Sequence, residues 1–413
     1  MTRKGVWGLQ DVRDKYLEDK WDADSNTLWV WGSNNYGEGG QNNRTEMYEP
    51  TQVPGTDWDE PQPMTTAAGG SHTRFCRKLD GTMWAWGQNN FGQLGLNDVV
   101  NRSSPTQIPG TWANIYPGEE ACYGVRTDGT FWSWGSNSRG GLGLNQPTPT
   151  KISSPTQIPG TNWAYGLGKV SAGLQSCGAL KTDGSLYNWG DNEYGQLGQG
   201  NKTQYSSPRQ VPGTSWNSVG GIYSVAFATR TDGSLWAWGP NEGGKLGLNG
   251  PTNQDYSSPK QVMGDGNWAR VYGSASTVAA FDDAGKMYLW GNNNKGTMAM
   301  SLPENKQYSS PILIPGIWES SSMGMMVGGG TWVALKKDGR MWGCGSQSES
   351  QSVMGRYNRS VPNSEAPKVS SPIQLNAGFW KAGSVQGGHY GGMGIKRNCL
   401  NEDYTKGIDQ INV

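Results

Sequence analysis

The dipeptide Trp-Gly recurs along this chain at nearly even spacing, and no other feature limits the fold more. The repeats are 48 to 55 residues apart, and in the seventh the dipeptide reads Cys-Gly. They stand at Trp31, Trp86, Trp134, Trp189, Trp238, Trp290 and Cys344. Units of about 50 residues are typical of radially arranged β-sheets, because the units of helical solenoids run at about 33–47 residues and need helix-period apolar stripes.

A proline marks each unit as well, and we expect it to open a short strand. The seven copies are Pro50, Pro105, Pro155, Pro208, Pro259, Pro311 and Pro372. A tight turn is predicted before Trp-Gly, since the pair Asp183-Gly184 and its counterparts supply the glycine that primed turns require. The turn signal is weaker in the first unit, Ser25-Asn26, and in the sixth, Ala284-Gly285.

The strand that follows the turn has two apolar faces. In the fourth unit, alternation places Tyr187 and Trp189 on one face and Leu186 on the other. An isolated sheet would expose one of these faces, whereas a blade wedged between two neighbours buries both. The sequence therefore predicts an all-β fold, a seven-bladed β-propeller.

The two ends of the repeat region look like halves of one blade. The first unit begins near residue 22 without the strand pair that precedes the turn elsewhere, and residues 376–398 resemble that pair without a turn after it. We expect 22–50 and 376–398 to complete one shared blade, which closes the ring and removes exposed sheet edges. The predicted domains are an arm at 1–21, a propeller at 22–398 and a tail at 399–413.

The repeats resemble a known family, the regulator of chromosome condensation repeat. Its pattern Asp-Gly-x-Leu-Trp-x-Trp-Gly-x-Asn-x-x-Gly-x-Leu-Gly is matched at 183–198 and 232–247, and the resemblance covers roughly 22–398. It implies a seven-bladed propeller. The seventh unit departs from it, because Cys344 replaces Trp and 346–367 lacks the Asn-x-x-Gly-x-Leu-Gly segment, so we expect an irregular loop there.

The first 21 residues stand outside the repeats. Apolar residues at near-helical spacing predict a short amphipathic helix that must dock, on its own propeller or on another chain. The pattern Gly-Val-Trp-x-Leu-x-x-Val-Arg-Asp resembles the start of marine bacteriophage tail-fibre and other virion proteins. That resemblance implies an anchor to a virion formed by Trp7, Leu9, Val12, Tyr16 and Trp21.

Charge and apolar runs exclude several classes of function. Lys and Arg together number 34, as do Asp and Glu, so the chain lacks the basic excess of nucleic-acid binders. No apolar run is long enough for a membrane span or a signal peptide, which predicts a protein made in the host cytoplasm without membrane insertion. The five cysteines are widely spaced, and we expect them to be reduced and buried.

No catalytic constellation is visible. The two histidines, His72 and His389, fall in units that would be neighbours, but a third metal ligand is missing, so no metal is expected. The aspartates of the Asp-Gly pairs already serve their turns. The Gly-rich segments lack the P-loop pattern, and no serine has a suitably placed histidine. We therefore expect neither enzymatic activity nor a cofactor.

Two functions follow from these observations. The first is a structural protein of a phage virion, a tail or tail-fibre propeller that contacts other virion proteins and a host surface receptor, with the arm also able to join identical chains. The alternative is a cellular propeller that binds a soluble protein partner, like the exchange factors and inhibitors built on this repeat. Candidate contact residues lie in the loops 97–102 and 145–151 and at Arg356, Tyr357 and Arg359.

Overall fold

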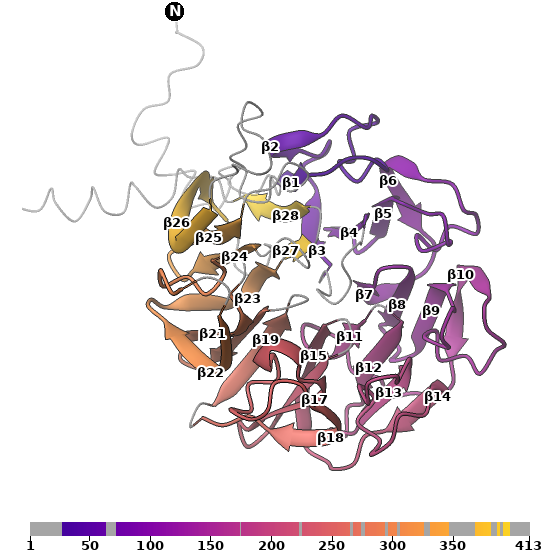
Figure 1. Ribbon diagram of the computed structural model, residues 1–413. Helices are drawn as coiled ribbons and strands as arrows, with labels where there is room; N and C mark the ends of the chain where they lie inside the picture. Colours follow the sequence, from indigo (N-terminus) through magenta and orange to yellow (C-terminus); the bar gives the residue numbers. More distant parts are fainter. Residues whose placement is uncertain are drawn as a thin grey trace, which may run out of the picture.

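Seven four-stranded blades stand in a ring around a common centre (Figure 1). The computed structural model describes residues 27–62, 72–173, 175–222, 225–264, 267–273, 277–293, 296–303, 306–325, 331–346, 368–380, 386–388 and 391–396. Five blades are separate sheets, and two share one eight-stranded sheet in which Gly324 pairs with Gly387. The chain is thus an all-β, seven-bladed propeller, as its repeats predict.

The blades are numbered along the chain, and their strands are given from the centre of the ring outward. Blade 1 contains β27 (Gln386–Gly388), β28 (Gly391–Lys396), β1 (Thr27–Gly32) and β2 (Met47–Gln52). Blade 2 contains β3 (Trp58–Pro61), β4 (Thr73–Lys78), β5 (Met83–Gly87) and β6 (Arg102–Ile108), and blade 3 contains β7 (Trp112–Pro117), β8 (Ala121–Arg126), β9 (Phe131–Ser136) and β10 (Lys151–Ile158).

The other four blades repeat this order. Blade 4 contains β11 (Val170–Ala172), β12 (Ser176–Leu180), β13 (Leu186–Gly190) and β14 (Tyr205–Gln210), and blade 5 contains β15 (Trp216–Ile222), β16 (Val225–Arg230), β17 (Leu235–Pro240) and β18 (Asp255–Gln261). Blade 6 contains β19 (Trp268–Gly273), β20 (Thr277–Asp282), β21 (Met287–Asn292) and β22 (Gln307–Ile314), and blade 7 contains β23 (Trp318–Met325), β24 (Thr331–Lys336), β25 (Arg340–Ser346) and β26 (Lys368–Phe379). A short 3-10 helix, η1 (Glu242–Gly244), follows β17.

Blade 1 is built from both ends of the repeat region, as the sequence predicts. Strand β1 pairs antiparallel with β28 without interruption, from Thr27 opposite Lys396 to Gly32 opposite Gly391. The shared blade packs on both neighbours, because Leu28 joins a buried cluster with Trp58 of blade 2, and Trp31 joins one with Val333 of blade 7. The ring is therefore closed by backbone hydrogen bonds between the first and the last described strands.

Each strand that carries Trp-Gly is buried on both faces. In β5, Trp86 belongs to the cluster shared with blade 1, whereas Met83 and Ala85 belong to the cluster shared with blade 3. All three side chains are fully buried. The packing of aromatic and small residues between blades thus replaces the single core of an ordinary globular domain, and the radial packing that the alternation predicts is confirmed.

The Trp of Trp-Gly also ties its blade to the preceding one. In blades 2 to 6 its indole Nε1 donates a hydrogen bond to a loop carbonyl of that blade, for example from Trp86 to Glu38 at 2.8 Å and from Trp290 to Lys245 at 2.9 Å. In blade 7, where Cys344 replaces Trp, Trp332 lies directly opposite on β24 and donates the same bond to Thr297 at 2.9 Å. In blade 7 the Trp thus lies on β24 and the small residue, Cys344, on β25, which is the reverse of the arrangement in blades 3 and 4.

The recurring prolines lie inside the outermost strand of each blade and do not open it. Pro155, for example, falls between Ile152 and Thr156 of β10, where the register with β9 shifts. The other six prolines occupy the corresponding irregularity. The expected strand start was therefore wrong, and the physical reason is that a proline cannot donate to a ladder and is tolerated in an outer strand at a bulge.

Candidate functional site

One register position at the inner edge of the ring carries a different residue in each of five blades. The innermost strand begins beside the Asp-Gly turn, since Trp58 pairs with Lys78 just before that turn, and we call this side of the ring the turn face. The next paired position in the innermost strand is the variable one. Its residues, here called the rim residues, are Glu60, Asn114, Lys169, Ser218 and Arg270 in blades 2 to 6.

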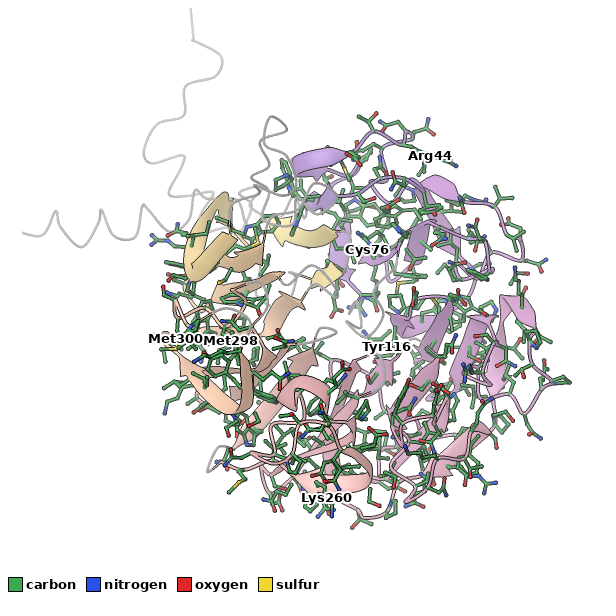
Figure 2. The ribbon with its side chains drawn as sticks, viewed as in Figure 1. Arg44, Cys76, Tyr116, Lys260, Met298 and Met300 are labelled. Atoms are coloured by element: carbon green, nitrogen blue, oxygen red, sulfur yellow. The ribbon has the colours of Figure 1, made fainter. Side chains whose placement is uncertain are left out.

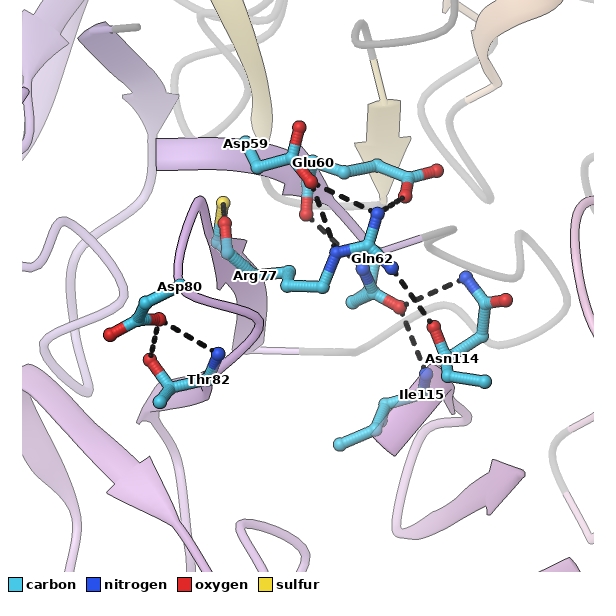
Figure 3. Close-up of polar contacts among 10 residues, drawn as sticks. Asp59, Glu60, Gln62, Arg77, Asp80, Thr82, Asn114 and Ile115 are labelled. Atoms are coloured by element: carbon cyan, nitrogen blue, oxygen red, sulfur yellow. Dashed lines mark hydrogen bonds and ion pairs between the residues drawn. The ribbon is translucent and has the colours of Figure 1, made fainter. Parts of the chain in front are cut away.

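In blade 2 the rim residue belongs to a charged cluster (Figure 3). The Arg77 guanidinium donates from Nη2 to Glu60 at 2.8 Å and from Nε to Asp59 at 3.1 Å. Its Nη1 donates to the Ala113 carbonyl of blade 3 at 3.4 Å. The cluster therefore contains two carboxylates and one guanidinium. The Glu60 side chain is 42% exposed, so its carboxylate is accessible to solvent.

A second contact in Figure 3 locks blade 2 to blade 3. The Gln62 Oε1 accepts hydrogen bonds from the Asn114 Nδ2 at 3.2 Å and from the Ile115 backbone N–H at 3.0 Å. Gln62 is fully buried and Asn114 is 6% exposed. Asn114 therefore serves the packing of the blades. Ser218 is also buried, with its hydroxyl bonded to that of Thr229, whereas the charged rim residues are less buried.

Blade 4 presents a loop that blade 3 lacks. Four residues, 165–168, lie between Ala164 and the rim residue Lys169, whereas Asn114 follows Ala113 directly. The Tyr116 hydroxyl of blade 3 donates to the Gly166 carbonyl and accepts from the Gly166 N–H, both at 2.9 Å. Figure 2 shows Tyr116 on the inner side of the ring. The inserted loop is thus fixed at the inner edge.

Two basic rim residues meet at this loop. The Arg270 Nη1 of blade 6 donates to the Leu167 carbonyl at 2.9 Å, and the Lys169 Nζ donates to the Asn217 carbonyl of blade 5 at 2.5 Å. Burial, followed by the positive charge of Arg270, lowers the pKa of Lys169 from its ordinary value. Two cationic groups are therefore held near each other by carbonyl acceptors from other blades.

The charged residues along the inner edge differ from blade to blade. Asp59 and Glu60 lie in blade 2, and Glu319 lies near the start of β23 in blade 7, whereas Lys169 and Arg270 lie in blades 4 and 6. Blades 7, 1 and 2 adjoin one another, as do blades 4, 5 and 6 (Figure 1). Among these inner-edge residues, the acidic ones therefore lie in blades 7 and 2 and the basic ones in blades 4 and 6, and Glu319 and Arg270 lie in adjoining blades.

A buried ion pair lies on the opposite face, between blades 1 and 2. The His72 Nδ1 is 2.6 Å from the Glu38 Oε1, and the Tyr36 backbone N–H donates to the Glu38 Oε2 at 2.7 Å. Arg74 is buried nearby. Burial by itself raises the pKa of Glu38, but the hydrogen bond and charge of His72 together with Arg74 lower it overall. In the part of the chain that the structure describes, no three His, Cys, Asp or Glu side chains are grouped to hold a metal ion.

The contact residues predicted from the sequence fall in two places. Trp7, Leu9, Val12, Tyr16 and Trp21 of the arm, as well as Arg356, Tyr357 and Arg359, lie outside the described residues. His389, which the sequence places in a unit next to that of His72, lies outside them too. The loops 97–102 and 145–151 lie on the face opposite the turns, and Val99 and Val100 are 53% and 59% exposed there.

The rim residues were missed by the sequence reasoning. An alignment of the units on the Trp that opens each innermost strand would have shown most of them, since Glu60, Ser218 and Arg270 stand two residues after Trp58, Trp216 and Trp268. The insertion 165–168 hides Lys169 from such an alignment.

The fold and the repeats define the class of this protein, a seven-bladed propeller of tandem β-repeats. Its blades share their packing residues and differ along the inner edge. Residues 80–114, 128–180, 183–226 and 232–281 match the family described as "Regulator of chromosome condensation (RCC1) repeat". These stretches of the chain are RCC1 repeats, and the fold is the seven-bladed propeller that the sequence resemblance implies.

Solved structures share this fold along almost the whole chain. Yeast RCC1 (Prp20) bound to Kap60 superposes with a TM-score of 0.74 at 16% identity, over 94% of this chain and 92% of that one. Human WBSCR16 superposes with a TM-score of 0.71 at 17% identity, over 91% and 100%. At such identities the likeness concerns the fold.

Among curated proteins, the E3 ubiquitin-protein ligase HERC2 of Homo sapiens is 30% identical over 209 residues, which are 49% of this chain and 4% of that protein. The ultraviolet-B receptor UVR8 of Arabidopsis thaliana is 27% identical over 188 residues, 44% of this chain and 41% of that protein. The matched region thus spans less than half of these relatives. No helix in the described ranges is long and apolar enough to cross a membrane.

Proposed function

We propose that this chain is a protein-binding propeller without catalytic activity of its own, and that its partner docks on the turn face across the charged rim residues. The observation that carries the proposal is the single register position that holds Glu60, Lys169 and Arg270 in otherwise similar blades. Charges of both signs, fixed at particular blades of a rigid ring, orient a partner of complementary charge and reject others.

The names of relatives support a partner-binding role. One relative is the X-linked retinitis pigmentosa GTPase regulator of Homo sapiens, which is 26% identical over 187 residues. Two structures of the yeast protein are titled for its binding to Kap60 and for its binding properties to Gsp1p and histones. These partners are theirs, and for this chain we propose only the class, a soluble protein that presents both acidic and basic groups.

The test is affinity capture from the source lysate, with partners identified by mass spectrometry. We expect the double variant Lys169→Gln/Arg270→Gln to retain a specific partner about tenfold less than the wild type, because two charge-assisted contacts are lost. The matched control is Arg139→Gln/Lys202→Gln on the other face, where the side chains are 46% and 54% exposed. Equal capture by the wild type and the rim variant would reject the turn face as the docking surface.

The virion assignment receives no support from the relatives named above, none of which is a virion protein. It depends on residues 1–21, which lie outside the described part, and the location in a virion stays a prediction. The same capture with a chain that begins at residue 22 separates the two functions. A soluble partner that both chains retain supports the propeller as the binding unit, and virion proteins retained only by the full chain support the arm.

A further inference from the structure

The centre of blade 4 departs from the pairing of large with small residues found in neighbouring blades. In blades 2, 3 and 5 an aromatic residue of the second strand faces a small residue of the third, as Phe75 faces Ala85 and Phe227 faces Ala237. In blade 4 the corresponding pair is Gly178 and Asn188. Blade 4 therefore lacks the ring that fills the space toward the next blade.

A cavity of about 30 Å³ lies at this place, between blades 4 and 5. Its lining residues include Ser171, Ser176 and Cys177 of blade 4 and Val219, Gly220 and Gly221 of blade 5. A Cβ on Gly178 would lie 3.2 Å from Val219 and 2.7 Å from the Asn188 Oδ1, so the glycine itself keeps the space open. In blade 2 the corresponding Phe75 packs with Ile115 of blade 3.

Asn188 brings an unsatisfied polar atom to the cavity. Its Nδ2 donates to the Leu197 carbonyl at 3.2 Å, whereas its Oδ1 has no hydrogen-bond partner within the described structure. The side chain is buried, with the residue only 3% exposed. A buried acceptor without a donor is costly and rare, which indicates that the cavity holds a molecule that donates to it.

The lining also defines the chemistry of that molecule. No charged side chain lines the cavity among the described residues, and the Val219, Val225 and Leu197 side chains are apolar. A charged ligand would be desolvated without a counter-charge, so a neutral one is required. The volume admits about two to four non-hydrogen atoms, since one water needs about 10–15 Å³ by the same measure.

We propose that the cavity between blades 4 and 5 is a binding site for a small neutral molecule, a primary amide or an alcohol, whose N–H or O–H donates to the Asn188 Oδ1. The hydroxyls of Ser171 and Ser176 lie in the same lining and provide further polar partners. This site is separate from the rim residues and does not depend on the proposed function.

The experiment uses acetamide as the probe on the full chain, followed by ligand-observed NMR titration and a crystal structure of the soaked protein. The double variant Gly178→Phe/Asn188→Ala copies the Phe/Ala pair of blades 2 and 5. We expect the wild type to bind acetamide and this variant to bind at least about tenfold more weakly, because the Phe ring fills the cavity and the Asn188 acceptor is absent. We also expect the variant to unfold at a higher temperature, since the void and the unsatisfied oxygen are gone.

A second variant tests the proposal if the first variant does not fold. Gly178→Ala/Asn188→Leu copies the pair Ala279 and Leu289 of blade 6, with the same expected loss of binding. Ordered water alone in the soaked wild-type crystal, or equal titration curves for the wild type and a folded variant, would overturn the proposal. Density for acetamide within hydrogen-bond distance of the Asn188 Oδ1 would support it.

Discussion

At the scale of single residues, Glu38 shows how one side chain departs from a repeat without breaking it. In blades 2 and 4 the same place is held by Gln93 and Gln196, whose Oε1 atoms accept the backbone N–H two residues earlier, as Glu38 does. The carboxylate adds an ion pair with His72 at 2.6 Å. In blade 1, a charged carboxylate therefore replaces the neutral amide of blades 2 and 4, and it also bonds to His72 of blade 2.

Because the folded-state pKa of Glu38 is lowered, its carboxylate stabilises the fold at pH values above its unfolded pKa. That contribution is lost as the pH falls through the folded pKa, so the free energy of unfolding should decline below about pH 4.5. We expect Glu38→Gln, which keeps the acceptor for the Tyr36 N–H, to be less stable at pH 7 and to show a smaller acid loss. Denaturant unfolding at pH 7, 5, 4 and 3 checks this.

Glu193→Gln, at a side chain that is 55% exposed, is the matched control and should leave the acid slope unchanged. The same slope for wild type and Glu38→Gln would show that the ion pair does not contribute to acid sensitivity.

At the scale of the strand, the residue just before the turn carries, in five blades, a cation that lies between two aromatic rings. In blade 5 the Arg230 guanidinium lies 4.5 Å from the Trp216 ring and 4.3 Å from the Trp236 ring. Lys78, Arg126, Lys181 and Lys336 do the same in blades 2, 3, 4 and 7. Blade 6 has Asp282 instead, which accepts the Lys286 N–H of the turn at 2.8 Å.

Arg230→Met keeps most of the apolar stem but removes the charge between the rings. We expect a loss of about 1 kcal/mol in the free energy of unfolding, the usual size of a partly exposed cation–π contact. Lys260→Met is the control, since Lys260 is exposed at the outer edge of the same blade (Figure 2). Guanidinium unfolding of the three proteins measures the difference, and equal stabilities for both variants would exclude a contribution from the stacked cation.

At the scale of the whole molecule, stability depends on a blade whose strands come from both ends of the repeats. Deletion of residues 386–413 removes β27 and β28 and leaves β1 as an unpaired edge. We expect this chain to unfold at a markedly lower temperature and to associate through that edge, because an exposed strand pairs with other chains. Scanning calorimetry and light scattering after gel filtration follow both effects.

Removal of 397–413 alone is the matched control, since the paired strands then remain. A milder variant, Ile395→Ala, should cost about 2–5 kcal/mol because Ile395 is buried at 1% exposure. A chain without residues 386–413 that stays monomeric and unfolds at the wild-type temperature would show that the ring does not need its shared blade.

The periodic features of the molecule were readable from the sequence, and the exceptions were not. Trp-Gly spacing and strand alternation predict the blades and their closure, because packing in a ring depends on residues that recur. The contact that replaces a missing Trp depends instead on Trp332, which lies opposite Cys344 only once the strands are paired. The basic rim residues likewise come together from blades far apart in the sequence, since Arg270 reaches Leu167 only once blades 4, 5 and 6 are packed together.

The pairing of β1 with β28 also constrains the order of events during synthesis. Residues 27–32 emerge from the ribosome early, but their partner at 391–396 is made only after six complete blades. Until then, one edge of the nascent chain is an unpaired strand that carries Leu28 and Val30, which are buried in the finished protein. Between the synthesis of β1 and that of β28, the exposed strand can therefore associate with other nascent chains translated from the same messenger RNA.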